Sequence, residues 1–244
     1  MSGATAGASP ALEILPAETW AAVVAERLVG RLEANPGLRV CLPTGHTPAP
    51  LYDRLGELDR AEPGRWARAT VVLLDEFTGL PQGDPSRFDR WVRSALIDRL
   101  APPPRFIPID VDGGDMNAAV ARHDAAAMGL DIAVVGLGLN GHIGLNEPGS
   151  SPADETRVVR LAASSQEAAT TRYGATRTPT AGITIGLARL LEAGEIWLLV
   201  TGERKAGVLR RALREPEGSD CPASYLRRHP RLVVFADEAA ATLL

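Results

Sequence analysis

The sequence predicts an α/β fold built on a doubly wound, mostly parallel sheet with helices on both faces. Short apolar runs rich in Val, Ile and Leu recur along the chain, and their hydrophobicity is continuous, as expected of strands buried on both faces. The segments between these runs carry apolar residues three and four positions apart, which is typical of amphipathic helices. Strand and helix therefore alternate as in βαβ units.

Each predicted element rests on its own stretch of sequence. The apolar runs predict strands, in chain order, over residues 38–42 (LRVCL), 69–75 (ATVVLLD), 105–109 (RFIPI), 131–136 (DIAVVG), 195–200 (EIWLLV) and 231–236 (RLVVFA). The spacing of apolar residues predicts helices over residues 17–34, 47–58, 86–100, 116–127 and 203–214. We therefore expect residues 13–244 to form a single α/β catalytic domain.

Two segments lack a clear period. Residues 1–12 are rich in Ala, Gly and Ser, and we expect them to be disordered. Residues 149–180 contain two prolines and many Ser and Thr, and we interpret them as a mobile lid over a site.

The composition argues against several classes of protein. A formal charge of −4, with acidic and basic residues interspersed, leaves no basic stripe for a nucleic-acid backbone. No apolar run reaches the roughly 18 residues that a membrane span needs, and the first residues lack the pattern of a secretory signal. Two cysteines, Cys41 and Cys221, are too few for a disulfide framework. We therefore expect a cytoplasmic protein that binds neither nucleic acid nor membrane.

In an open α/β sheet, ligands bind beyond the carboxyl ends of the strands. The first predicted strand is followed by PTGHTP, where Thr44, Gly45, His46 and Thr47 offer hydroxyl groups, an imidazole and close backbone N–H groups. Thr47 before Pro48 has the pattern of a helix N-cap, a position that favours an anion. We interpret this turn as a phosphate cradle, although a plain capped turn into a helix stays an alternative because GxxxxGK[ST] is absent.

The second strand is followed by two carboxylates. Asp75 lies where burial can hold one protonation state and fix the direction of the side chain, as a base that takes a proton from carbon requires. Glu76 either faces solvent or orients a partner. The alternative for Asp75 is that it only caps a loop.

The third strand is followed by GLGLNGHIGLNEPG. Gly136, Gly138 and Gly141 satisfy GxGxxG, but the Gly, Asn and Pro residues that follow interrupt the helix that a dinucleotide-binding turn requires. We therefore expect Gly138 and Gly141 to let the backbone turn tightly around a substrate. His142 and Glu147 supply an imidazole and a carboxylate that could act together in acid/base chemistry.

Two further features bear on the chemistry. The zinc deaminase pattern of HxE with a later PCxxC is absent, so we expect neither a metal nor another cofactor.

After the strand at 195–200, Lys205 lies at the start of a predicted helix, where it could neutralise a phosphate or remain a solvated surface lysine. Of the other histidines, His123 is expected on a helix surface.

From about residue 35 to 240, the chain resembles the glucosamine-6-phosphate deaminase (isomerase) family, within the glucosamine/galactosamine-6-phosphate isomerase and 6-phosphogluconolactonase superfamily. The motifs that carry the resemblance are, in order, PTGHTP, LDEFTGLP, GLGLNGHIGLNEPGS, TRV at 156–158, TGERKAGVLRRAL and CPASYLRRHP. The 6-phosphogluconolactonases instead carry a DER-type acidic motif and a GHTASLFP-like continuation, so LDEF and HIGLNEP favour the deaminase branch.

The resemblance implies a Rossmann-like α/β fold and a metal-free conversion of glucosamine 6-phosphate and water to fructose 6-phosphate and ammonia. It implies that Asp75 moves a proton between C2 and C1, and that His142, supported by Glu147, opens the pyranose ring. It also implies a phosphate site, which comprises Thr44, Gly45, Thr47 and Lys205.

Some positions depart from the family pattern. Asn140 stands where several members have an aspartate and others an asparagine, so more of the support of His142 would fall to Glu147. His46 replaces a small residue and either crowds the phosphate turn or adds a donor. Arg172 matches a phosphate-contacting arginine only if one residue is inserted before it, and Phe77 lacks the hydroxyl of the commoner tyrosine.

Three rival functions stay open at this point. Galactosamine 6-phosphate differs from the glucosamine compound only at C4, and the sequence does not place the residues that would tell the two apart. A 6-phosphogluconolactonase-like hydrolase would share the phosphate turn but use no C2 base. A sugar-phosphate-binding regulator would bind without turnover. The sequence also leaves a homo-oligomer possible.

Overall fold

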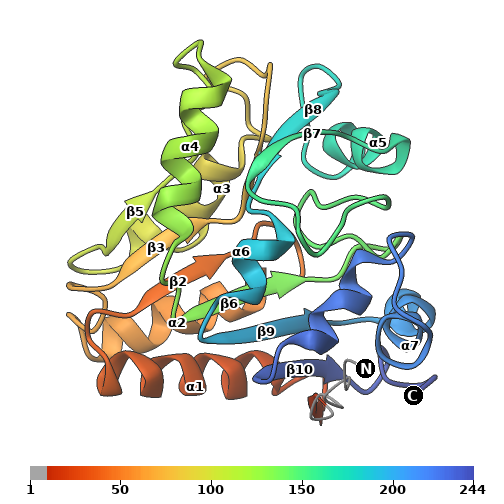
Figure 1. Cartoon of the computed structure of the whole chain (residues 1–244). Coiled ribbons are helices and arrows are strands. Elements are labelled where there is room, and N and C mark those ends of the chain that lie inside the picture. Colours follow the sequence, from red (N-terminus) through yellow and green to blue (C-terminus); the bar gives the residue numbers. More distant parts are fainter. Residues whose placement is uncertain (1–9) are drawn as a thin grey trace, which may run out of the picture.

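The computed structural model describes residues 10–244, which build a seven-stranded central sheet in which every pair of neighbours is parallel. Figure 1 shows the strands side by side with helices packed on either face. In spatial order the strands are β1 (Ala11–Leu15), β10 (Leu232–Asp237), β9 (Glu195–Val200), β6 (Ile132–Gly136), β2 (Arg39–Leu42), β3 (Thr70–Leu73) and β5 (Arg105–Ile107).

The helices cover both faces of this sheet. In chain order they are α1 (Trp20–Ala34), α2 (Ala49–Ala61), α3 (Phe88–Ala95), α4 (Met116–Ala127), α5 (Ala163–Thr171), α6 (Leu187–Leu191) and α7 (Ala206–Arg214). Three short 3₁₀ helices are η1 (Ile97–Arg99), η2 (Glu203–Lys205) and η3 (Pro222–Arg228). The predicted fold class is confirmed.

Two hydrophobic cores lie on opposite faces of the sheet, because successive strand residues point to opposite sides. In β2, Val40 and Leu42 belong to the core that α1, α2 and α3 cover, whereas Cys41 belongs to the core that α6 and α7 cover. Both faces are therefore buried, which explains the continuous apolar runs in the strand sequences.

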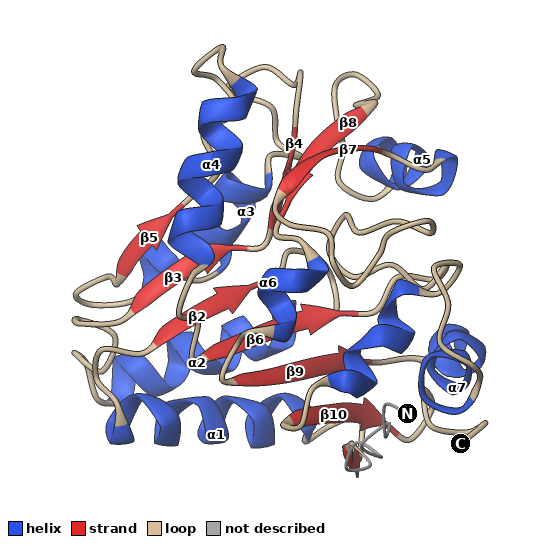
Figure 2. Ribbon diagram, viewed as in Figure 1, coloured by secondary structure: helices blue, strands red, loops and turns tan. Residues whose placement is uncertain are grey.

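A second, three-stranded antiparallel sheet stands beyond the carboxyl end of β3. It consists of β4 (Asp75–Phe77), β8 (Ala181–Thr184) and β7 (Arg157–Arg160), with β8 in the middle. Figure 2 shows this sheet and helix α5 beside the ends of the central strands. The small sheet fixes the direction of Asp75, whose backbone pairs with Thr184.

The structure differs from the sequence prediction at several boundaries. Residues 1–9 of the segment expected to be disordered lie outside the described residues, but Ala11 and Leu12 belong to β1 because they pair with Val233 and Val234 of β10. The predicted helix over 86–100 ends at Ala95 and resumes as η1. The segment 149–180 contains β7 and α5, neither of which was predicted. In residues 10–244, the structure contains no helix with the length and apolar character of a membrane span.

Candidate active site

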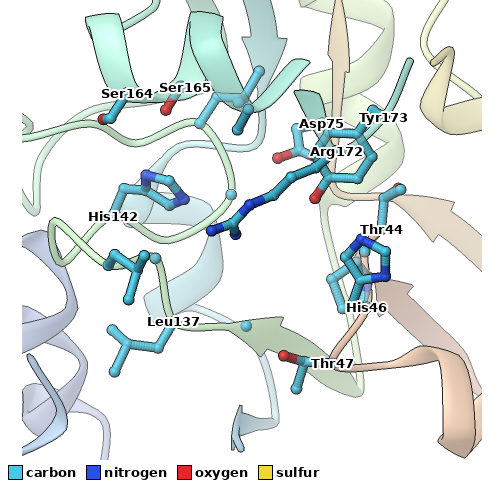
Figure 3. Close-up of a pocket in the computed structure, with 18 of the residues that line it drawn as sticks. Thr44, His46, Thr47, Asp75, Leu137, His142, Ser164, Ser165, Arg172 and Tyr173 are labelled. Carbon is cyan, nitrogen blue, oxygen red and sulfur yellow. The ribbon is translucent and has the colours of Figure 1, made fainter. Parts of the chain in front are cut away.

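A cavity of about 550 Å³ lies beyond the carboxyl ends of the central strands. Its walls come from the turn after β2, the start of β4, the loop after β6, helix α5 and the residues that follow it, and η2. Figure 3 shows the side chains converging on this space. Of the residues singled out from the sequence, the following line it: Thr44, Gly45, His46, Thr47, Asp75, Gly138, Asn140, His142, Arg172 and Lys205.

The turn after β2 forms one end of the cavity. Gly45 has a φ of 122°, and a β-carbon there would lie 3.0 Å from the hydroxyl oxygen of Tyr173, so the position favours glycine. The hydroxyl of Thr44 is buried and has no hydrogen-bond partner among residues 10–244. The N-cap expectation for Thr47 is wrong, because α2 begins at Ala49 after Pro48 and no side chain caps it. Thr47 lines the cavity instead.

Asp75 is the buried carboxylate of the site. Asp75 is 4% exposed. Burial is the main cause that raises its pKa to about 7, and the negative charge of Glu147 is the second. A carboxyl group with this pKa is a good proton acceptor and donor at neutral pH. Gly144 lets the neighbouring loop approach closely, since a β-carbon there would lie 3.2 Å from Oδ2 of Asp75.

Glu76 has a structural role on the other side of the strand. It is fully buried, and its carboxylate accepts hydrogen bonds from the backbone N–H groups of Phe77 at 2.8 Å, Phe88 at 3.0 Å and Asp89 at 2.9 Å. The alternative that it faces solvent is wrong, because these bonds hold it against the first turn of α3. It therefore orients the backbone next to Asp75.

His142, Glu147 and Asn140 form a connected group in the loop after β6. Nδ1 of His142 lies 3.3 Å from Oε2 of Glu147, and the Asn140 amide donates to that same oxygen at 2.9 Å. Burial would raise the pKa of Glu147, but the hydrogen bond and charge of His142, with the Asn140 amide, lower it to about 2. Glu147 does not line the cavity and would act through His142.

The two loop glycines have different surroundings. A β-carbon on Gly138 would lie 2.3 Å from the His142 ring, so the ring packs flat against this glycine. Gly141 has a φ of 89° and packs against Cys221, away from the cavity lining. Gly141 therefore shapes the loop but is not brought to the expected substrate position.

Three basic side chains, those of Arg172, Arg204 and Lys205, line the cavity. The guanidinium of Arg172 points into the cavity from the end of α5 (Figure 3). Lys205 Nζ donates to the carbonyl of Leu137, and burial together with the charges of Arg172 and Arg204 lowers its pKa to about 8. The same shift indicates that these cations act on one region of the cavity, where a dianion would relieve their repulsion.

The sequence analysis missed several residues of the site. Tyr173 lies against Phe88 and Phe77 at centroid distances of 5.3 and 6.4 Å, and its hydroxyl approaches Gly45. Its position next to Arg172 in TTRYG was the available signal. Arg204 and Ser164 also line the cavity. His123 was placed wrongly: it is buried, and its Nε2 donates to the carbonyl of Leu73 at 2.7 Å, so this face of α4 is turned toward the end of β3.

Comparisons with known proteins establish the family of the chain. The family model for glucosamine-6-phosphate isomerases and 6-phosphogluconolactonases matches residues 15–234. The chain belongs to this family. Within it, the chain is 35% identical over 243 residues to the glucosamine-6-phosphate deaminase of Rhodopirellula baltica, a match that covers 96% of this chain and 95% of the relative.

Solved structures of the family give the same picture. The chain is similar to a monomeric glucosamine-6-phosphate deaminase with a TM-score of 0.90 and 28% identity, over 96% of this chain and 100% of that one. It shares its fold with the 6-phosphogluconolactonase of Thermotoga maritima, with a TM-score of 0.75 and 18% identity, over 94% of this chain and 100% of that one. The family expected from the sequence motifs is confirmed.

Proposed function

We propose that this protein isomerises and deaminates an amino-sugar 6-phosphate, converting glucosamine 6-phosphate and water to fructose 6-phosphate and ammonia. One observation carries the proposal: Asp75 and His142 line the same cavity as a group of cations that suits a phosphate. The deaminase relative of Rhodopirellula baltica, 35% identical over almost the whole chain, supports the same reaction.

The first step is ring opening by His142. The imidazole moves a proton to the ring oxygen of the pyranose, and the C1 hydroxyl gives up its proton, so that the ring opens to the aldehyde. Glu147 lies 3.3 Å from Nδ1 of the His142 imidazole and stabilises the charged form of that imidazole. Nε2 of His142 is thereby left for the substrate. Asn140 keeps Glu147 in place through its amide.

The second step is proton transfer by Asp75. Its carboxylate removes the proton from C2 of the open chain to give an enediolamine, and it returns a proton to C1. The resulting C2 imine adds water and loses ammonia, which leaves fructose 6-phosphate. Positioned proton transfer of this kind contributes about 10²–10⁴-fold to a rate.

The phosphate anchors the sugar away from the reacting carbons. We place it between the turn Thr44 to Thr47 and the cations Arg172 and Lys205, because the buried hydroxyl of Thr44 has no hydrogen-bond partner within the described part of the chain. His46 lines the same turn and could add a donor. Binding energy from this distant group orients the reacting carbons.

The properties of Asp75 argue against two rival functions, a lactonase and a sugar-phosphate-binding regulator. A lactonase hydrolyses an ester and has no proton to remove from C2, and the similarity to lactonase structures at 18% identity concerns the fold alone. A regulator that only binds sugar phosphate has no use for a buried carboxyl group with a pKa of about 7 inside the cavity. Galactosamine 6-phosphate remains the alternative substrate within the proposed reaction.

The test is to incubate the purified protein with glucosamine 6-phosphate and with galactosamine 6-phosphate separately and to follow ammonia. We expect one of the two to give ammonia and a ketose phosphate, and Asp75→Asn to lose nearly all rate while it still binds the substrate. Asp98→Asn, a matched change at an exposed position, should keep the full rate. Hydrolysis of 6-phosphogluconolactone without ammonia release from either amino sugar would refute the proposal.

The proposal also covers location and assembly. We propose a cytosolic protein, since Cys41 and Cys221 are both buried free thiols. We propose that a monomer carries out the reaction. The similar deaminase structure is likewise of a monomeric enzyme. Mass photometry of the active enzyme would show whether it also forms the homo-oligomer that the sequence leaves possible.

A further inference from the structure

A buried carboxylate outside the cavity joins two segments that are far apart in the chain. Asp84 lies between β4 and α3 and is 2% exposed. Its Oδ1 accepts from the backbone N–H of Ser86 at 3.0 Å and from the Ser86 hydroxyl at 2.5 Å. Its Oδ2 accepts from the backbone N–H of Thr176 at 3.1 Å and from the Thr176 hydroxyl. One oxygen therefore binds a neighbour in the chain, Ser86, and the other binds Thr176, which is 92 positions from Asp84.

Thr176 follows Arg172 and Tyr173, two cavity-lining residues that come directly after α5. The chain between them wraps tightly around the helix end, since Tyr173 N donates to Ala168 O at 3.3 Å and Ala175 N donates to Ala169 O at 2.9 Å. The hydrogen bonds from Thr176 to Asp84, which we call the tether, therefore limit how far Arg172 and Tyr173 can move.

The segment on the other side of Asp84 is equally well fixed. Phe88 follows it at the start of α3, and its backbone N–H is held by Glu76 at 3.0 Å. The ring of Phe88 packs on Tyr173 at a centroid distance of 5.3 Å. Asp84 therefore links Tyr173 and its neighbour Arg172 to a wall that is anchored next to Asp75.

We propose that Asp84 and Thr176 are positioning residues that hold Arg172 and Tyr173 in the cavity in the arrangement that binds the sugar phosphate. The ligand named here rests on the proposed function, whereas the tether itself does not. Neither residue lines the cavity, so both act through the segment between α5 and β8. Burial would raise the pKa of Asp84, but the hydrogen bonds from Ser86 and Thr176 lower it to about 2, so the carboxylate stays charged at neutral pH.

Three variants test the tether. Asp84→Asn replaces an acceptor oxygen with a donor, and Thr176→Val removes the hydroxyl while it keeps the shape of the side chain. We expect each to raise KM for glucosamine 6-phosphate, and Kd for inorganic phosphate, by about 5- to 30-fold, with kcat within about threefold of wild type. Thr176→Ser retains the hydroxyl and should restore KM to near the wild-type value.

Asp59→Asn is the matched control. Asp59 is also 2% exposed and accepts a backbone N–H, that of Ala101 at 2.8 Å, but it does not line the cavity. This variant should lower Tm without changing KM or Kd. Asp84→Asn and Thr176→Val combined should have no more effect on Kd than the stronger single change, because they break the same contact.

Hydrogen exchange separates failure of the tether from failure of the proposed function. We expect Asp84→Asn and Thr176→Val to speed exchange in residues 163–176, whereas Asp59→Asn leaves this segment unchanged. This result and the loss of phosphate affinity would stand even if neither amino sugar were deaminated. The inference would be overturned if Asp84→Asn and Thr176→Val both kept a Kd for phosphate within twofold of wild type. It would also be overturned if Thr176→Ser lost as much affinity as Thr176→Val.

Discussion

Nδ1 of His142 lies 3.3 Å from Oε2 of Glu147, and that oxygen also receives the side-chain amide of Asn140 at 2.9 Å. One carboxylate oxygen therefore fixes both the direction of the imidazole and its protonated nitrogen. The other oxygen of Glu147 accepts the backbone N–H of Ala162 at 3.4 Å, just before α5. Glu147 thus connects the acid/base loop to the helix that covers the cavity.

Glu147→Gln should lower kcat by about 100-fold, because an amide cannot stabilise the charged imidazole. Phosphate binding should not change, since Glu147 lies outside the cavity lining. Ammonia release and the Kd for inorganic phosphate measure the two effects separately. A variant with wild-type kcat would show that His142 needs no carboxylate.

Gly138→Ala should displace the His142 ring, because the new β-carbon would lie 2.3 Å from its atoms. We expect kcat to fall by at least about 10-fold while Kd for phosphate stays within twofold. Gly207→Ala is the matched control, since outside the backbone of α7 itself no described residue has an atom within 4 Å of the added β-carbon. Equal kcat in the two variants would contradict the observed packing.

The pH dependence of kcat/KM should be bell-shaped. Asp75 has a pKa of about 7 and must lose its proton to act as the base, so kcat/KM should rise as pH passes 7. Lys205 has a pKa of about 8 and must keep its proton to attract the phosphate, so kcat/KM should fall above 8. Lys205→Gln should remove the alkaline limb and keep the acidic one. A profile that stays flat from pH 6 to 9 would contradict both assignments.

Asp75→Asn should stabilise the fold at alkaline pH. Because burial raises the folded-state pKa of Asp75 from 3.8 to about 7, its neutral form favours folding, and that stability is lost as pH rises from about 4 through 7. The amide does not titrate, so the variant should gain on the order of 2–4 kcal/mol over wild type at pH 8 and little at pH 4. Thermal unfolding at the two pH values measures the difference. A lower Tm of the variant than of wild type at pH 8 would show that burial does not destabilise the charged form of Asp75.

Much of the fold could be predicted because the central strands are apolar on both faces. All six predicted runs became strands of the parallel sheet. The elements that were missed are short or only partly buried, and β1 has no fully buried residue because it lies at the edge of the sheet. The three-residue strand β4 was not predicted: the predicted run ended at Asp75, which is its first residue, and Glu76 was expected beyond the strand.

The site was predictable where its residues directly follow strands. Thr44, Asp75 and His142 meet in the cavity because parallel strands bring their carboxyl ends to one edge. The contacts of Tyr173 and Asp84 could not be read from the sequence, although Tyr173 stands next to Arg172, because these contacts join segments that are far apart in the chain. The burial of His123 was hidden as well, since α4 has little contrast between its faces.

The most direct test of the proposed chemistry is to run the reaction in D₂O and to analyse C1 of the fructose 6-phosphate by NMR. If Asp75 moves the proton between C2 and C1 and exchanges with solvent on the way, the wild-type product should carry deuterium at C1. Asp75→Asn should form no labelled ketose over the same period. Ammonia release at the wild-type rate by Asp75→Asn would contradict the account, because the proton would then be moved by another group.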